Sequence, residues 1–108
     1  MTLTRDYKQT IIERAKADPN FSSALFDEAI SLFLHGEVES SRLIMRDLVN
    51  ATVGFETLAQ SMNKSSKSLH RMLSSRGNPT MDNLSEVIVS LQTSLKLETQ
   101  VRVAPLAK

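Results

Sequence analysis

Apolar side chains recur at helical spacing along most of the chain, and residues that stop or start helices interrupt this pattern repeatedly. Because an amphipathic helix must bury one face, a series of such segments predicts helices packed around a shared core. The predicted helices cover residues 3–17, 19–35, 38–53, 56–62, 65–75 and 81–95. A chain of 108 residues forms one core more readily than two, so we expect a compact all-α domain of five to six helices over residues 1–95.

The interruptions carry the residue types that helix ends require. Asp18 can cap free amide groups, and Pro19 fits the first helical position because its missing N–H would be unbonded there. Gly36 is expected to end the second helix in the left-handed conformation, and Asn63 tolerates the same conformation in a tight turn. Thr80 is a predicted cap for the final helix. The second helix, apolar on more than one stripe, is expected to be the most buried.

The end of the chain has a different pattern. From Leu95 to Val103, apolar residues and threonine alternate with charged and amide side chains, which predicts a half-buried strand. Residues 96–108 are therefore expected to form a short C-terminal β-strand or tail. One strand leaves its backbone groups unpaired, so we expect it to pair with a copy of itself or with another protein's sheet edge. The alternative is a loose tail.

The positive charge of the chain is local. The formal net charge is +1, but residues 1–54 sum to −2 and residues 55–78 to +3, with Glu56 as the only acid in the second range. A basic segment in a near-neutral protein is a candidate for contact with phosphate, although most such segments are solvated surface.

The composition argues against several other classes. The absence of cysteine excludes thiolate catalysis and cysteine zinc sites, and His35 and His70 are too few to predict a metal site. Gly36, Gly54 and Gly77 do not form a phosphate-cradling loop, so we expect neither an enzyme nor a cofactor. No apolar stretch approaches the length of a membrane span and no signal peptide is evident, so a cytoplasmic protein is expected.

The run over residues 55–73 resembles the helix-turn-helix of phage-repressor-like (XRE-type) regulators. In that motif a small residue, here Ala59, lets two helices approach. A turn residue follows four positions later, usually glycine and here Asn63, and an aliphatic residue, here Leu69, anchors the second helix in the core. The sequence departs from the motif at Asn63 and at Lys64, where a hydrophobic residue is commoner.

The resemblance extends to the HigA-like antitoxins, also described as addiction-module antidote proteins. Residues 69–84 look like their recognition helix followed by a Gly-Asn-Pro-Thr loop and a further helix, and residues 3–7, 18–19 and 49–56 are also similar. Together the likeness covers most of residues 3–95. It implies a helix-turn-helix at 55–75, a homodimer on an inverted-repeat DNA operator, repression of its own operon, and neutralisation of a RelE-like toxin.

The candidate site lies on the second helix of the motif, with Leu69, Met72 and Leu73 expected to face the core. The resemblance assigns base reading in the major groove to Ser66, Lys67 and Arg71. Arginine can bind the O6 and N7 atoms of guanine in a bidentate manner, and lysine serves bases or phosphates. The remaining candidates for phosphate or groove contacts are Gln60, Lys64, Ser65, His70, Arg76 and Asn78.

Two other functions remain open. A stand-alone phage or plasmid repressor would use the same DNA-binding fold without a toxin partner. A helical interaction module would instead bind a protein through its acidic first half and keep the two-helix motif only as structure. Salt-dependent DNA binding separates the module from the two regulators.

Overall fold

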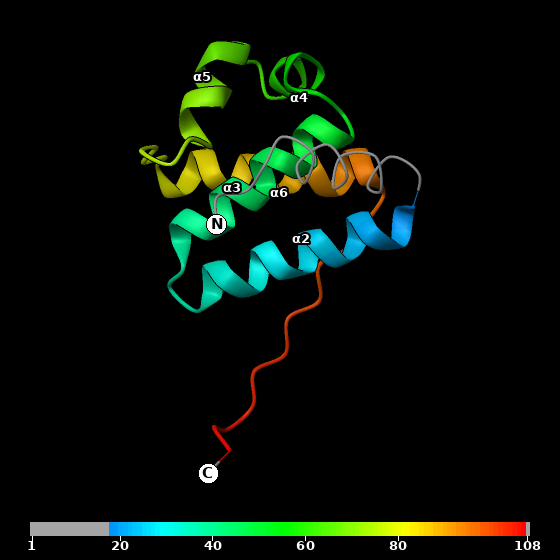
Figure 1. Ribbon diagram of the computed structural model, residues 1–108, viewed down its shortest axis with the longest axis vertical. Helices are drawn as coiled ribbons and strands as arrows, with labels where there is room; N and C mark the ends of the chain where they lie inside the picture. Colours follow the sequence, from blue (N-terminus) through cyan, green and yellow to red (C-terminus); the bar gives the residue numbers. More distant parts are fainter. Residues whose placement is uncertain (1–17, 108) are drawn as a thin grey trace, which may run out of the picture.

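The computed structural model describes residues 18–107, which are helical over most of their length. The helices are α2 (Pro19–Leu34), α3 (Val38–Ala51), α4 (Phe55–Ser61), α5 (Ser66–Met72) and α6 (Met81–Leu95) (Figure 1). These five confirm the predicted helices, although residues 73–75 leave the helix that was expected to include them. The helix predicted over residues 3–17 lies outside the described range.

The caps predicted from sequence are present. The Asp18 side chain accepts a hydrogen bond from the Asn20 amide at 3.0 Å, and Thr80 Oγ1 accepts one from the Asn83 amide at 3.1 Å. Gly36 has a φ of 86°, as expected for the residue that ends α2. Each of these ends was identifiable because capping depends on a few neighbouring residues.

Helices α2 and α3 pack along each other as a hairpin. Ala29 and Ser41 are fully buried, and the Ser41 hydroxyl donates a hydrogen bond to the Ala29 carbonyl at 2.7 Å. Small side chains at this contact let the two helices approach, and the hydrogen bond removes the cost of burying the hydroxyl.

The expectation that α2 is the most buried helix is wrong at its C-terminal end. Phe26, Ala29 and Ile30 lie in the core, but Phe33 is only half-buried and Leu34 is 58% exposed. The apolar residues of α2 cover more of its surface than α3 alone can bury.

A single cluster of buried side chains connects the two halves of the chain. It joins Met45 and Leu48 of α3 to Leu58 of α4, Leu69 of α5 and Leu91 of α6. Helix α4 packs on both α3 and α6 and places the α4–α5 pair on the far side of the molecule from α2 (Figure 1).

The predicted C-terminal strand is wrong: the described residues contain no β-strand. Lys96 adopts the left-handed conformation, with φ 56°, and the Leu97 amide donates to the Gln92 carbonyl at 2.9 Å, which closes α6. Leu97 then packs against the core. The apolar–polar alternation that begins at Leu95 therefore arises from the end of α6 and the hydrophobic contact of Leu97 that follows it. Beyond Gln100 the chain is extended and exposed, and it leaves the helical body (Figure 1).

Between residues 18 and 107, no helix has the length and apolar character required to cross a membrane.

Candidate functional site

Helices α4 and α5 are joined by a short turn centred on Asn63. Asn63 has a φ of 57°, which confirms the left-handed conformation expected there. Its amide donates to the Gln60 carbonyl at 3.1 Å, and the Lys64 amide donates to the Ala59 carbonyl at 2.9 Å. These two bonds satisfy carbonyls at the end of α4 and fix the direction in which the chain enters α5.

Helix α5 has one buried and one exposed face. Leu69 is fully buried and Met72 nearly so. Lys67 and Arg71, four residues apart, are exposed on a common stripe, whereas Ser66 is half-buried beside His70 on the neighbouring stripe. The structure therefore brings the three predicted base-reading residues onto one short helix, with the two cations together.

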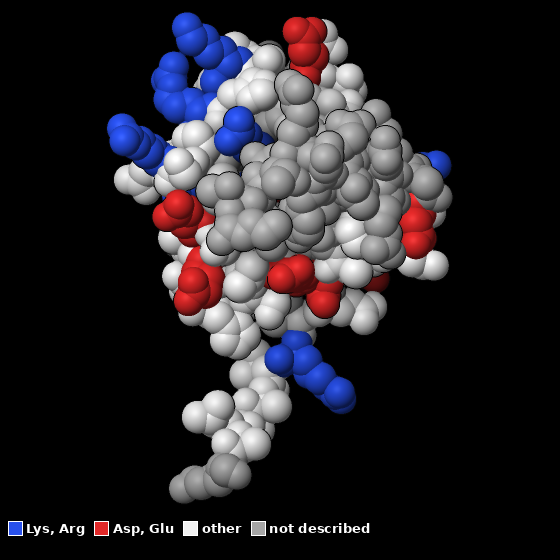
Figure 2. Space-filling model, viewed as in Figure 1, with Lys and Arg blue, Asp and Glu red and all other residues white. Residues whose placement is uncertain are grey.

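Positive charge is concentrated on this side of the molecule. Figure 2 shows Lys and Arg side chains gathered over α5 and the loop that follows it. Residues 57–81 contain no aspartate or glutamate, and Arg76 and Asn78 are exposed in the α5–α6 loop. Gln60 is exposed on α4. The local field therefore favours an anionic ligand over a cationic one.

Ser65 and His70 have structural partners at this surface. The Ser65 side chain caps α5 by accepting from the Ser68 amide at 3.1 Å, and its hydroxyl keeps one hydrogen to donate. The His70 ring stacks on the buried Phe55 ring of α4, with centroids 3.7 Å apart and an interplanar angle of 12°. This contact holds the exposed His70 ring in place and ties α5 to the start of α4.

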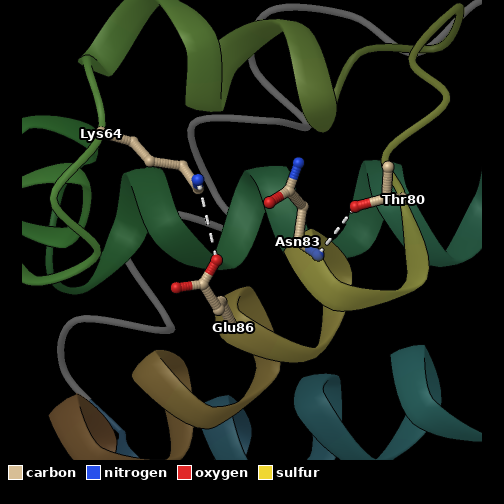
Figure 3. A network of polar contacts seen from close by, with 4 residues as sticks. All are labelled: Lys64, Thr80, Asn83 and Glu86. Carbon is tan, nitrogen blue, oxygen red and sulfur yellow. Dashed lines mark hydrogen bonds and ion pairs between the residues drawn. The ribbon is translucent and has the colours of Figure 1, made fainter.

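Lys64 is placed differently from the other candidate cations. Its side chain is only 28% exposed, and its Nζ lies 3.7 Å from Glu86 Oε1 of α6 (Figure 3). Thr80 and Asn83 form the cap of the same helix one turn before Glu86 (Figure 3). The ion pair connects the α4–α5 turn to α6. Lys64 therefore has a structural role, although a hydrophobic residue is commoner at this position of the motif.

Two residues that position α5 were missed by the sequence analysis. The Arg42 guanidinium of α3 donates to the carbonyls of Ser74 and Ser75, both at 3.2 Å. A side chain at Gly77 would place its Cβ 2.5 Å from the carbonyl oxygens of Arg71 and Met72. The sequence offers no signal for the Arg42 contact, because its partners lie more than 30 residues away.

The arrangement provides hydrogen-bond donors and positive charge on a convex helical surface. Among residues 18–107, no three His, Cys, Asp or Glu side chains are grouped so that they could hold a metal ion. A helix with exposed cations and a fixed orientation can enter a groove of matching width and contact anionic groups there. Comparisons of the chain with protein-family models, with curated proteins and with solved structures gave no match.

Proposed function

We propose that this chain is a sequence-specific DNA-binding transcriptional regulator in which α4, the Asn63 turn and α5 act as a helix-turn-helix. The observation that carries the proposal is the exposed stripe of Lys67 and Arg71 on a helix whose opposite face is anchored by Leu69. An α-helix fits the major groove, where side chains from its surface reach base edges.

In this proposal Arg71 binds the O6 and N7 atoms of guanine, Lys67 contacts a base or a phosphate, and Ser66 contacts a neighbouring base edge. Ser65, Gln60, Arg76 and Asn78 lie on α4 or on segments flanking α5, and they would contact phosphates on either side of the groove. These contacts fix the orientation of α5, because phosphates carry no direct sequence information.

Lys64 and His70 have smaller parts in the proposal. Lys64 is engaged by Glu86, so a phosphate would have to compete with the carboxylate for its ammonium group. His70 is held against Phe55 and can offer only the exposed part of its ring to the groove. His70 ties α5 to α4 and Lys64 ties the α4–α5 turn to α6, so both residues support the proposal chiefly by holding α5 in place.

The regulator is proposed to act as a homodimer on an inverted-repeat operator in the cytoplasm. Two α5 helices related by a two-fold axis would read half-sites about 34–36 Å apart, one turn of double-stranded DNA. The narrower assignment, an antitoxin that represses its own operon and neutralises a RelE-like toxin, rests on the sequence resemblance. Co-expression with the product of the adjacent gene tests it, since a stand-alone repressor would form no complex.

Selection of binding sites from a random DNA pool tests base reading. Arg71→Ala is expected to weaken specific binding by about 1–3 kcal/mol and to relax preference at one base position. Lys96→Gln is the matched control, because it removes an exposed cation at the C-terminal end of α6, whereas α5 and its loop lead into the N-terminal end of α6. Identical selected motifs for the wild type and Arg71→Ala would reject base reading by Arg71.

The salt dependence of binding tests whether DNA is a ligand at all. The logarithm of the DNA association constant falls linearly with the logarithm of the salt concentration, and each cation that neutralises a phosphate adds about 0.9 to the magnitude of the slope. Arg76→Ala is therefore expected to weaken binding to all sequences similarly and to decrease the magnitude of this slope by about 0.9. A chain that binds no DNA at low salt would instead be a helical interaction module.

A further inference from the structure

The large apolar side chains that remain exposed in residues 18–107 fall into two sets. One set lies where the end of α2 meets the starts of α3 and α6, and the other lies on residues 100–107, the C-terminal tail. The first comprises Leu34, Val38, Met81 and Val89, and the second comprises Val101, Val103 and Leu106. Exposed apolar side chains gathered in this way mark interaction sites more often than scattered ones do.

Three residues of the first set, Val38, Met81 and Val89, line a groove, the α2–α3–α6 groove, with a volume of about 510 Å³. More buried residues, among them Phe33 and Leu84, complete its lining. This volume lies within the range of about 300–1,000 Å³ that is typical of ligand pockets, and the lining is mainly apolar. The groove could accept apolar side chains from an extended segment.

The chain is held in place just before the C-terminal tail begins. The Thr99 amide donates to Gln92 Oε1 at 3.0 Å, and Leu97 packs against the core. From Val101 onward every described residue is exposed, and Val103 and Leu106 are 92% and 95% exposed. An extended segment with unpaired backbone and exposed apolar side chains is suited to binding in a groove.

The C-terminal tail and the residues that flank the groove carry opposite charges. Residues 100–107 contain Arg102 and no acid. Arg42 also lines the groove, but its guanidinium is hydrogen-bonded to carbonyls of the α5–α6 loop. Glu37 and Glu39 flank Val38 in sequence, and Asp82 follows Met81; all three are exposed. Complementary charge of this kind favours the tail as occupant and disfavours an acidic peptide.

We propose that the α2–α3–α6 groove binds the C-terminal tail of a second copy of this chain, and that the two copies exchange tails. The tail starts at the opposite end of α6 from the groove, and α6 spans about 22 Å. It leaves the helical body after passing α2 and extends away from its own helices, so its apolar side chains are accessible to a second copy (Figure 1). A two-fold exchange makes each contact twice and covers both apolar sets within a closed dimer.

This inference specifies how the proposed homodimer forms, but it does not depend on DNA binding. Sedimentation of the full chain without DNA measures it directly. The wild type is expected to be a dimer, and Met81→Glu and Val103→Glu should each raise the dimer dissociation constant by about tenfold or more, because each buries an unpaired carboxylate. Thr57→Glu, which adds the same charge at an exposed position of α4, is the control.

Folding does not confound these variants. Met81 and Val103 are 84% and 92% exposed, and glutamate at the first position of α6 is favourable to the helix. Circular dichroism should therefore give wild-type helicity for all three variants. A wild type that sediments as a monomer at high concentration would overturn the proposal, as would a dimer that neither groove nor tail variant weakens.

Disulfide trapping identifies which surfaces meet, and the absence of native cysteine makes it specific. Mixed Val89→Cys and Val103→Cys proteins should form a cross-linked heterodimer on oxidation, faster than either protein alone. Two results would contradict the exchange. Cross-linking of Val103→Cys alone, without the mixed product, would mean that the tails pair with each other. A monomeric cross-link in the double variant, with no dimer, would mean that each tail occupies its own groove.

Discussion

The two sides of the molecule differ in how completely the chain buries its own apolar residues. On the α4–α5 side, Leu58, Leu69 and Leu73 are fully buried, and polar and positively charged side chains lie at the surface. On the side of the α2–α3–α6 groove, longer helices leave Leu34 and Met81 exposed. Helix length therefore does not determine burial, because burial depends on what packs against each face.

The difference also separates two kinds of recognition. The α4–α5 surface is suited to an anionic ligand, and its backbone is fixed by the Asn63 turn, the Phe55–His70 stack and the Lys64–Glu86 ion pair. The α2–α3–α6 groove has a mainly apolar lining and is suited to an apolar segment. The proposed function, DNA binding by a homodimer, would use both kinds of surface, one for DNA and one for the second copy.

The largest expected effect comes from the same substitution made on each side. Leu69→Ala should lower the free energy of unfolding by about 2–5 kcal/mol, because Leu69 is fully buried in the shared core. Leu34→Ala, at a side chain 58% exposed, should change it by about 0.5 kcal/mol or less. Urea unfolding measures both changes, at a protein concentration low enough that association does not contribute to the free energy of unfolding. Equal losses would show that the two sides are buried alike.

A pair of glycine substitutions sharpens the comparison. Gly77→Ala should lower the free energy of unfolding by about 1–3 kcal/mol, because the new Cβ would overlap the backbone of Arg71 and Met72. The overlap should displace α5 and so weaken the proposed DNA binding. Gly36→Ala should lower the free energy of unfolding by about 1–2 kcal/mol, because a φ of 86° is unfavourable for alanine although the space around the Cβ is open. The affinity of the proposed dimer for DNA should be unchanged. Thermal unfolding and gel-shift titration separate the two effects. Unchanged DNA affinity in Gly77→Ala would contradict its role in positioning α5.

Two truncations separate residues 97–100, which follow the end of α6, from the residues proposed to associate. A chain ending at Gln100 should keep the monomer's free energy of unfolding but lose the proposed dimer, since residues 101–107 are exposed. In a chain ending at Lys96, the free energy of unfolding should also fall by about 1 kcal/mol. This truncation removes Leu97 from the core and deletes the amide that bonds to the Gln92 carbonyl at the end of α6. Sedimentation and urea unfolding test both. If both truncations had the same stability, Leu97 would contribute nothing to the core.

The smallest effect is expected at the Lys64–Glu86 pair. Glu86→Gln should destabilise the fold by about 0–1 kcal/mol, because the pair is partly exposed and screened by solvent. The loss should shrink as salt is added. Chemical unfolding at low and high salt measures it, with Glu98→Gln as a control on a residue for which no ion pair is found in the described structure. A loss independent of salt would indicate packing instead of charge.

The sequence was sufficient where structure depends on neighbouring residues. Helical spacing predicted the five described helices, and the residue types of Asp18, Asn63 and Thr80 predicted their caps and turn. The exposure of Lys67 and Arg71 also followed from the positions of Leu69 and Met72 on the same short helix. These features extend over one or two helical turns, so local propensity and periodicity determine them.

The tertiary structure decided what depends on residues distant in sequence. The alternation from Leu95 to Val103 predicts a strand wrongly, because only the packed structure distinguishes Leu97 in the core from an exposed Val103. The Arg42 contacts, the closeness of Gly77 to α5 and the exposed end of α2 likewise depend on how helices meet. A periodic pattern specifies which face of a helix is apolar, but the packing of the whole chain determines whether another element covers that face.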